Sequence, residues 1–181
     1  MFNNPRDPLT LLREIERRSN EASRGLPVKD EGASDEWAGI GFVLGRTPLL
    51  AATGEVSEIL WMPEYTRLPG VKPWVLGIAN VRGSLLPVLD TKSFLRGEGS
   101  TLSRRTRLLV IDHEGLRAGL LVDDVVGLRQ FPQERRSNEL PDVPAWLRPF
   151  VVGSILDNSG TWGIFSTRKL AEDPGFVNAA A

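Results

Sequence analysis

Short apolar runs separated by turn residues dominate the chain from Trp37 onward. Runs of about four to eight β-branched and other apolar residues, bounded by glycine, proline and aspartate, are typical of β-strands. The pattern predicts an all-β domain with one helical turn at 91–95. Strands are expected at 40–44, 49–52, 55–60, 75–81, 85–89, 107–111, 116–122, 123–128, 150–156 and 161–165.

The two ends of the chain have different patterns. Asp7-Pro8 is typical of a helix start, and apolar residues follow it at helical spacing, so a helix is expected to end before Gly25. The polar stretch that follows is interpreted as a linker, and the residues from Ala171 onward as a frayed tail. We therefore divide the chain into an N-terminal helix and linker (1–36), a β-domain (37–173) and a C-terminal tail (174–181).

The β-domain contains an internal repeat. Trp74-Val75-Leu76-Gly77 matches Phe150-Val151-Val152-Gly153 at an offset of 76 residues, and the same offset carries Leu89 onto Phe165. A loop, a strand that enters at a glycine, a turn, a second strand and a short helix thus occur twice. Two copies of one small β unit explain this pattern.

Each half of the repeat is too small to bury much surface alone, so the two halves are expected to share a core. Leu76 and Val152 are then expected at equivalent buried positions, and so are Leu89 and Phe165.

The first hairpin of the repeat carries the most distinctive turn. Two apolar runs flank Arg82-Gly83-Ser84, which predicts a hairpin with Arg82 at its tip and Gly83 at positive φ. The second hairpin has Asp157-Asn158-Ser159-Gly160, a plain turn, at the same place. This difference makes Arg82 a candidate contact residue, with an ordinary solvated turn as the alternative.

Composition narrows the classes of protein. The 181 residues include 41% hydrophobic and 25% charged residues, which is ordinary for a soluble protein. The net charge of −1 gives no basic field for nucleic acid or an anionic membrane. No apolar stretch approaches the roughly 20 residues that cross a bilayer, and the polar N-terminus is no signal peptide. Without cysteines there are no disulfides and no thiolate sites, and a cytoplasmic protein is expected.

No catalytic, metal or cofactor site is expected. His113, the single histidine, lies in a predicted turn, where an imidazole is poorly held for a catalytic triad. Asp123 and Asp124 are adjacent, and neighbouring residues of a strand point to opposite faces. The chain also lacks metal-ligand spacings and glycine-rich phosphate-binding loops.

One alternative function starts from a basic cluster. Arg104, Arg105 and Arg107, with tryptophans elsewhere, suit a small barrel that binds single-stranded nucleic acid. The near-neutral net charge weighs against this alternative.

The central hairpin carries a resemblance to a known family. Leu76-Gly77-Ile78-Ala79-Asn80-Val81-Arg82-Gly83, followed by Leu86-Pro87-Val88-Leu89-Asp90, resembles the signature of CheW-like chemotaxis adaptors. Val56-Ser57-Glu58-Ile59 and Gly119-Leu120-Leu121-Val122-Asp123 are similar to further family segments, and the resemblance spans 37–170. The N-terminal helix and linker before Trp37 resemble the PilI-type branch, which serves the system that controls type IV pili and twitching. Phe165-Ser166 departs from the leucine-aspartate that is common near the last strand.

The resemblance implies two small SH3-like β-barrels that share a hydrophobic core. It also implies a scaffold without catalysis, which joins a CheA-type histidine kinase, through the kinase's own CheW-like domain, to the cytoplasmic tip of a methyl-accepting chemoreceptor. Such a protein would lie at membrane-associated receptor arrays through its partners, without inserting in the membrane. By motif, Val56, Glu58 and Arg82 would lie at or near the receptor-binding surface, although Arg82 could instead brace the hairpin. The motif residues expected to be structural are Gly77, Asn80, Gly83, Pro87 and Asp90.

Overall fold

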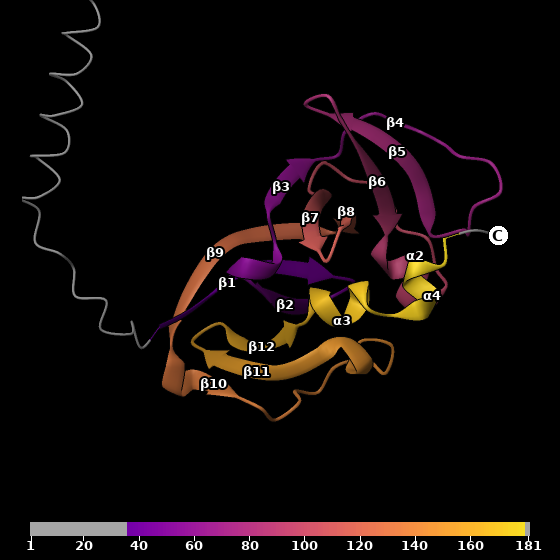
Figure 1. Cartoon of the computed structure of the whole chain (residues 1–181). Coiled ribbons are helices and arrows are strands. Elements are labelled where there is room, and N and C mark those ends of the chain that lie inside the picture. Colours follow the sequence, from indigo (N-terminus) through magenta and orange to yellow (C-terminus); the bar gives the residue numbers. More distant parts are fainter. Residues whose placement is uncertain (1–35, 180–181) are drawn as a thin grey trace, which may run out of the picture. The chain divides into compact units, whose positions relative to one another are not determined.

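Two six-stranded sheets, each curled on itself, form the body of the protein (Figure 1). The computed structural model describes residues 36–179. The predicted N-terminal helix and almost all of the linker lie outside the described residues. We call the sheet of order β10-β11-β12-β2-β1-β9 barrel A and the sheet of order β3-β7-β8-β6-β5-β4 barrel B.

Ten of the twelve strands of the described residues follow the predicted apolar runs, with most boundaries shifted by one to four residues, while the two-residue strands β4 and β10 lie in segments for which no strand was predicted. Barrel A contains β1 (Glu36–Leu44), β2 (Thr47–Ala52), β9 (Asp124–Pro132), β10 (Arg136–Ser137), β11 (Val151–Asp157) and β12 (Gly160–Phe165). Barrel B contains β3 (Glu58–Trp61), β4 (Tyr65–Thr66), β5 (Val75–Val81), β6 (Ser84–Asp90), β7 (Arg107–His113) and β8 (Leu116–Val122).

The helices are short and connect or follow strands. They are η1 (Thr53–Glu55), α2 (Thr91–Arg96), η2 (Gln133–Arg135), η3 (Arg148–Phe150), α3 (Thr167–Ala171) and α4 (Pro174–Val177). The helical turn predicted at 91–95 is confirmed as α2. Within the part of the chain that the structure describes, no helix has the length and apolar character needed to cross a membrane.

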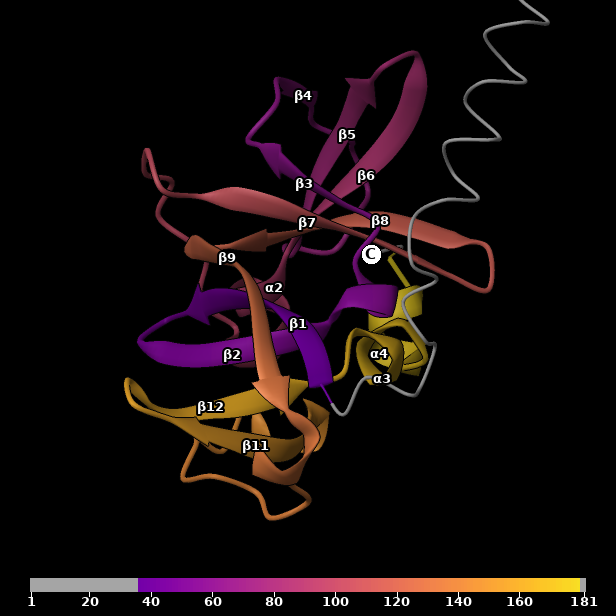
Figure 2. The same cartoon turned by 90° about the vertical axis from the view of Figure 1, so that its left-hand side faces the viewer.

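The two barrels have the same strand order, and each one combines strands from both halves of the chain. In barrel B, β6 pairs in parallel with β8, and in barrel A, β12 pairs in parallel with β2. The hairpin β1–β2 therefore completes the sheet of the second half, and the hairpin β7–β8 completes the sheet of the first half. Figure 2 shows β1 and β2 beside β12, away from β5 and β6. This exchange interlocks the two barrels.

The predicted repeat is confirmed in atomic detail at its glycines. The pairing of β5 with β6 shifts register between Val75 and Gly77, and the pairing of β11 with β12 shifts between Val151 and Gly153. A Cβ at Gly77 would lie 2.1 Å from the carbonyl oxygen of Thr66, and a Cβ at Gly153 would lie 2.4 Å from a backbone oxygen of the neighbouring strand. Only glycine fits at these bulges, because the backbone of the next strand occupies the space of a side chain.

Each repeat ends with a capped helix. Asp90 is buried, and its carboxylate accepts hydrogen bonds from the backbone of Ser93 at the start of α2 and from Ser100 in the following loop. Ser166 occupies the equivalent place in the second repeat and accepts from the backbone of Lys169 in α3. The serine thus retains the capping function, although it departs from the family pattern.

The central core is shared, as expected. One cluster of buried side chains joins residues of both barrels, including Phe42 of β1, Leu120 of β8 and Phe165 of β12. Leu89 and Phe165 occupy equivalent buried positions, which confirms that prediction.

The burial expected of Leu76 and Val152 is only partly confirmed. The two residues are equivalent, but each is half-buried and packs against a smaller cluster inside its own barrel. Each lies in the bulge of its strand, where the register shift leaves it without a directly paired residue on the neighbouring strand.

The expected fraying of the chain after Ala171 is wrong for the described residues. Asp173 caps the short helix α4, and Phe176 is 2% exposed. Its ring stacks on Trp74 with centroids 5.4 Å apart and meets Phe94 edge-on. The end of the second repeat is therefore anchored on the first.

Candidate functional site

The tip of the β5–β6 hairpin holds Arg82 in an uncommon backbone conformation. Arg82 has φ 51° and Gly83 has φ 83°, which is the pattern of a type I′ turn. The side chain of Asn80 accepts a hydrogen bond of 2.9 Å from the backbone of Gly83. A left-handed φ costs a residue other than glycine about 1–2 kcal/mol. Glu114 takes the same conformation in the β7–β8 turn, so a use for the Arg82 side chain has to be argued from its contacts.

Arg82 forms an ion pair with the first residue of β3. Its Nη2 lies 2.8 Å from Oε1 of Glu58, and the two side chains are 80% and 23% exposed. Ion pairs this exposed contribute at most about 1 kcal/mol to stability. The pair therefore adds little to the fold, and its main effect is to orient a guanidinium that stays open to solvent.

The third predicted contact residue has a different environment. Val56 lies between η1 and β3 with an extended backbone, is half-buried and packs against the central core. The strand predicted from residue 55 begins only at Glu58. The structure thus brings Glu58 and Arg82 together, while Val56 contributes at least part of its surface to the core.

The remaining motif residues support this hairpin. Gly77 permits the close approach of β4, Asn80 and Gly83 form the turn, and Asp90 caps α2. Pro87 lies opposite Ile78 in the β5–β6 pairing, just before β6 begins to pair with β8.

The groups that could have suggested catalysis have structural partners. His113 lies at the end of β7 rather than in the turn, and its Nε2 is 3.2 Å from Oε1 of Glu172. The hollow beside it has a volume of about 50 Å³. Among residues 36–179, no three histidine, cysteine or carboxylate side chains are grouped so that they could hold a metal ion.

Asp123 and Asp124 do not form a carboxylate pair that could share a proton. Asp123 accepts a hydrogen bond of 2.6 Å from the backbone of Gly45 and one of 2.6 Å from Lys92. Asp124 accepts from the backbone of Val125. Asp123 instead connects the β1–β2 turn of barrel A with α2 of barrel B.

A polar network lies at the tip of the β11–β12 hairpin in barrel A, the counterpart of the β5–β6 tip that carries Arg82. Asp157 pairs with Arg129 at 2.8 Å and also accepts hydrogen bonds from Ser159 and Trp162. Burial raises the pKa of Asp157, but the bonds from Ser159, Arg129 and Trp162 outweigh it and lower the pKa to about 2. Sequence reasoning missed this network, because nothing along the chain pairs Arg129 with a turn 28 residues away.

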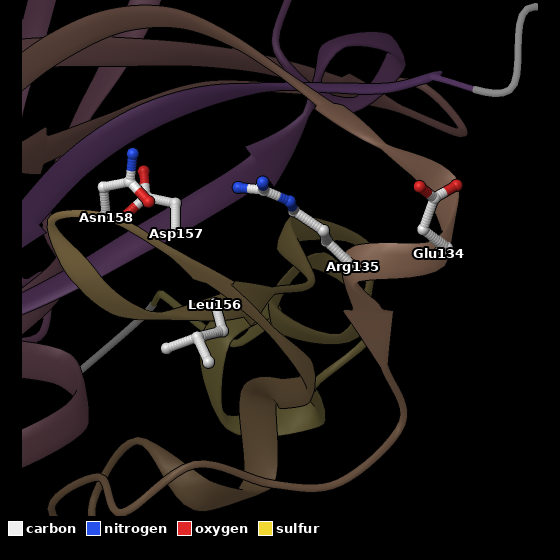
Figure 3. Close-up of a pocket in the computed structure, with 5 residues that line it drawn as sticks. All are labelled: Glu134, Arg135, Leu156, Asp157 and Asn158. Atoms are coloured by element: carbon white, nitrogen blue, oxygen red, sulfur yellow. The ribbon is translucent and has the colours of Figure 1, made fainter.

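An open hollow of about 480 Å³ lies beside this network. Figure 3 shows the guanidinium of Arg135 directed toward Asp157 and Asn158, with Leu156 below them in this view. The hollow is open to solvent, and Leu156 is the one apolar residue among the described residues that line it, so it does not resemble a small-molecule site.

Comparison with known proteins assigns the fold to a class. Residues 38–174 match the model of the CheW-like domain. The chain therefore belongs to the CheW-like family of chemotaxis adaptors. The crystal structure of the scaffolding protein TtCheW from Thermoanaerobacter tengcongensis is similar, with a TM-score of 0.65 and 25% identity over 77% of this chain and 94% of that one.

The relatives in this family indicate a branch. The chain is 44% identical to Protein PilI of Pseudomonas aeruginosa over 173 residues, which cover 96% of each protein. It is 30% identical to the chemotaxis protein CheW of Helicobacter pylori over 62% of this chain and 67% of that protein. It is 35% identical to Protein FrzA of Myxococcus xanthus over 50% of this chain and 57% of that protein.

Proposed function

We propose that this chain is a non-catalytic adaptor that couples the cytoplasmic tip of a chemoreceptor to a CheA-type histidine kinase. We further propose that its signalling system controls type IV pili and twitching motility. Membership of the CheW-like family and the 44% identity to PilI along almost the whole chain support both parts. Its place in the cell would then be cytoplasmic, at receptor arrays that it reaches through its partners.

The observation that carries the receptor assignment is the Glu58–Arg82 pair. Arg82 is exposed and contributes little to stability through its ion pair. Val56 lies two residues before Glu58 and has a partly exposed apolar side chain. An apolar residue beside two opposite charges suits a helical bundle, since the apolar contact gives affinity and the charges give orientation.

An adaptor also needs a second surface for the kinase. In this proposal the kinase binds through its own CheW-like domain, at a surface other than the Glu58–Arg82 pair. Variants of that pair should therefore separate the two binding events.

Arg82→Asn is expected to weaken binding of the receptor's cytoplasmic tip by about tenfold or more, while kinase binding stays unchanged. Asparagine tolerates the left-handed conformation, so the turn should persist and the melting temperature should hardly change. The two affinities are measured by titration calorimetry on the same protein preparation, together with a melting curve.

Glu114→Asn provides a matched control. Glu114 is the other described residue besides glycine with a positive φ, at 48°, and it lies exposed in the β7–β8 turn. This variant should bind both partners normally. A normal receptor affinity in Arg82→Asn would remove Arg82 from the receptor surface. If the affinities for receptor and kinase fall equally and the melting temperature is lower, Arg82 braces the hairpin instead.

The single-stranded nucleic-acid alternative is tested with the same preparation. Phosphate contacts make binding fall steeply as salt concentration rises. An adaptor should show no such binding to a fluorescent oligothymidylate, and micromolar binding with a steep salt dependence would contradict the proposal.

A further inference from the structure

An exposed tryptophan stacks against an arginine on the outside of barrel B. Trp61 is 71% exposed, and the guanidinium carbon of Arg107 lies 3.3 Å from the centroid of its ring. The β3–β7 register places the two residues directly opposite each other. Because successive side chains of a strand alternate, Trp61 and Ile59 project from the face of β3 opposite to that of Glu58.

The guanidinium of Arg107 is held in place by the backbone. Its Nη1 donates to the carbonyl oxygens of Arg104 and Thr106, both at 2.8 Å. Within residues 36–179, no hydrogen-bond partner occurs for its Nη2 or Nε. Two backbone carbonyls thus hold one edge of the Arg107 guanidinium, and the indole of Trp61 covers its face. The N–H groups of Nη2 and Nε remain as a planar pair of donors for a ligand.

The surroundings combine positive charge with apolar surface. Arg104 and Arg105 are exposed, and Nη1 of Arg105 lies 3.6 Å from Oδ2 of Asp124. Ile59 is 39% exposed beside Trp61. We call this surface the Trp61 patch; it consists of Ile59, Trp61, Arg104, Arg105 and Arg107.

We propose that the Trp61 patch docks an acidic segment of a partner protein. In this arrangement a carboxylate takes both open donors of Arg107, and a neighbouring apolar side chain of the segment packs on Trp61 and Ile59. Preorganised arginine and exposed tryptophan are the residue types that dominate binding energy in protein interfaces.

The features of the patch favour a carboxylate-bearing protein over other anions. The exposed apolar side chains of Trp61 and Ile59 beside the guanidinium suit a polypeptide, and the chain's net charge of −1 gives no broad field for a polyanion. The strand that carries Ile59 and Trp61, β3, is at the edge of its sheet, so a segment can approach it from outside. Docking here does not depend on the receptor assignment, because the Glu58–Arg82 pair belongs to the other face of β3.

The test uses the full-length chain and a synthetic peptide with capped ends and four Glu-Leu-Ser repeats. Binding is followed by NMR through the indole N–H signals, and the signal of Trp61 is assigned from its loss in Trp61→Phe. Addition of the peptide should shift the Trp61 signal to saturation. The same peptide with glutamine in place of glutamate should bind at least tenfold more weakly.

Two variants locate the interaction. Arg107→Lys keeps the charge but loses the planar pair of donors, and should weaken binding at least tenfold. Its melting temperature should fall only slightly, since the two backbone bonds that it loses are exposed or partly buried. Arg96→Gln removes an exposed cation that pairs with Glu98 elsewhere, and should leave binding unchanged.

Three results would overturn the proposal. Equal binding of the glutamine peptide would reduce the patch to a non-specific apolar surface. Tighter binding of an oligothymidylate or of a phosphoserine peptide would assign it to phosphate rather than carboxylate. An unmoved Trp61 signal at millimolar peptide would show that the patch does not bind acidic segments.

Discussion

Phe165→Ala is expected to lower the free energy of unfolding by about 3–5 kcal/mol. Phe165 is 1% exposed in the shared core, and its ring meets Phe42 edge-on at 5.9 Å and Phe150 at 6.2 Å. Truncation removes both aromatic contacts and leaves a cavity that the interlocked strands can close only in part. Urea unfolding followed by tryptophan fluorescence measures the loss.

The same experiment tests whether the two barrels unfold together. Trp162 packs in barrel A and Trp74 packs in the aromatic cluster with Phe176, and the difference between the wild type and each single Trp→Phe variant gives the signal of that tryptophan among the five. A shared core predicts coincident transitions for both reporters in the wild type and in Phe165→Ala. Leu156→Ala is the control: its side chain is 64% exposed, and the change should be within about 0.5 kcal/mol. Two separate transitions would contradict the interlocked architecture.

Gly77→Ala is expected to destabilise the protein by about 2–6 kcal/mol, from about 1–3 kcal/mol of backbone strain and about 1–3 kcal/mol of overpacking. Gly77 has φ 152°, and the added methyl group would lie 2.1 Å from the Thr66 carbonyl oxygen. That oxygen belongs to the backbone of β4 and cannot move aside by a side-chain rotation. Chemical denaturation compares this variant with the wild type.

Gly83→Ala separates the two causes. Gly83 also has a positive φ, of 83°, but a Cβ there would have no neighbour within 4 Å. The free energy of unfolding of Gly83→Ala should therefore fall only by the backbone strain, about 1–3 kcal/mol. Equal losses in the two variants would mean that the contact with β4 is unimportant, and no loss in Gly77→Ala would contradict the packing at the bulge.

Local patterns allowed much of the fold to be predicted. Apolar runs and turn residues report on neighbouring residues, and the constant offset between the two halves matched Gly77 with Gly153, although the bulges at these glycines were not predicted. The exchange of the β1–β2 and β7–β8 hairpins was out of reach, because it depends on which distant strands pair. The helix α4 could have been predicted in place of a frayed tail, because Asp173-Pro174 is the same capping signal as Asp7-Pro8.

The candidate site was predictable in part for the same reason. Glu58 and Arg82 came from motif resemblance, but their ion pair depends on the curl of barrel B. The positive φ of Arg82 was missed because glycine next to it accounted for the turn. The stacking of Trp61 on Arg107 was missed because only the β3–β7 register places these residues opposite each other.

The central claim is that the chain bridges two partners, and co-sedimentation tests it most directly. Membranes that contain the receptor encoded by the same organism are mixed with the co-encoded kinase, with and without this chain, and the pelleted kinase is measured. An adaptor predicts that kinase pellets with receptor membranes only when the chain is present, and that receptor-free membranes retain neither protein. Kinase that pellets equally well without the chain, or a chain that leaves the kinase in the supernatant, would contradict the account.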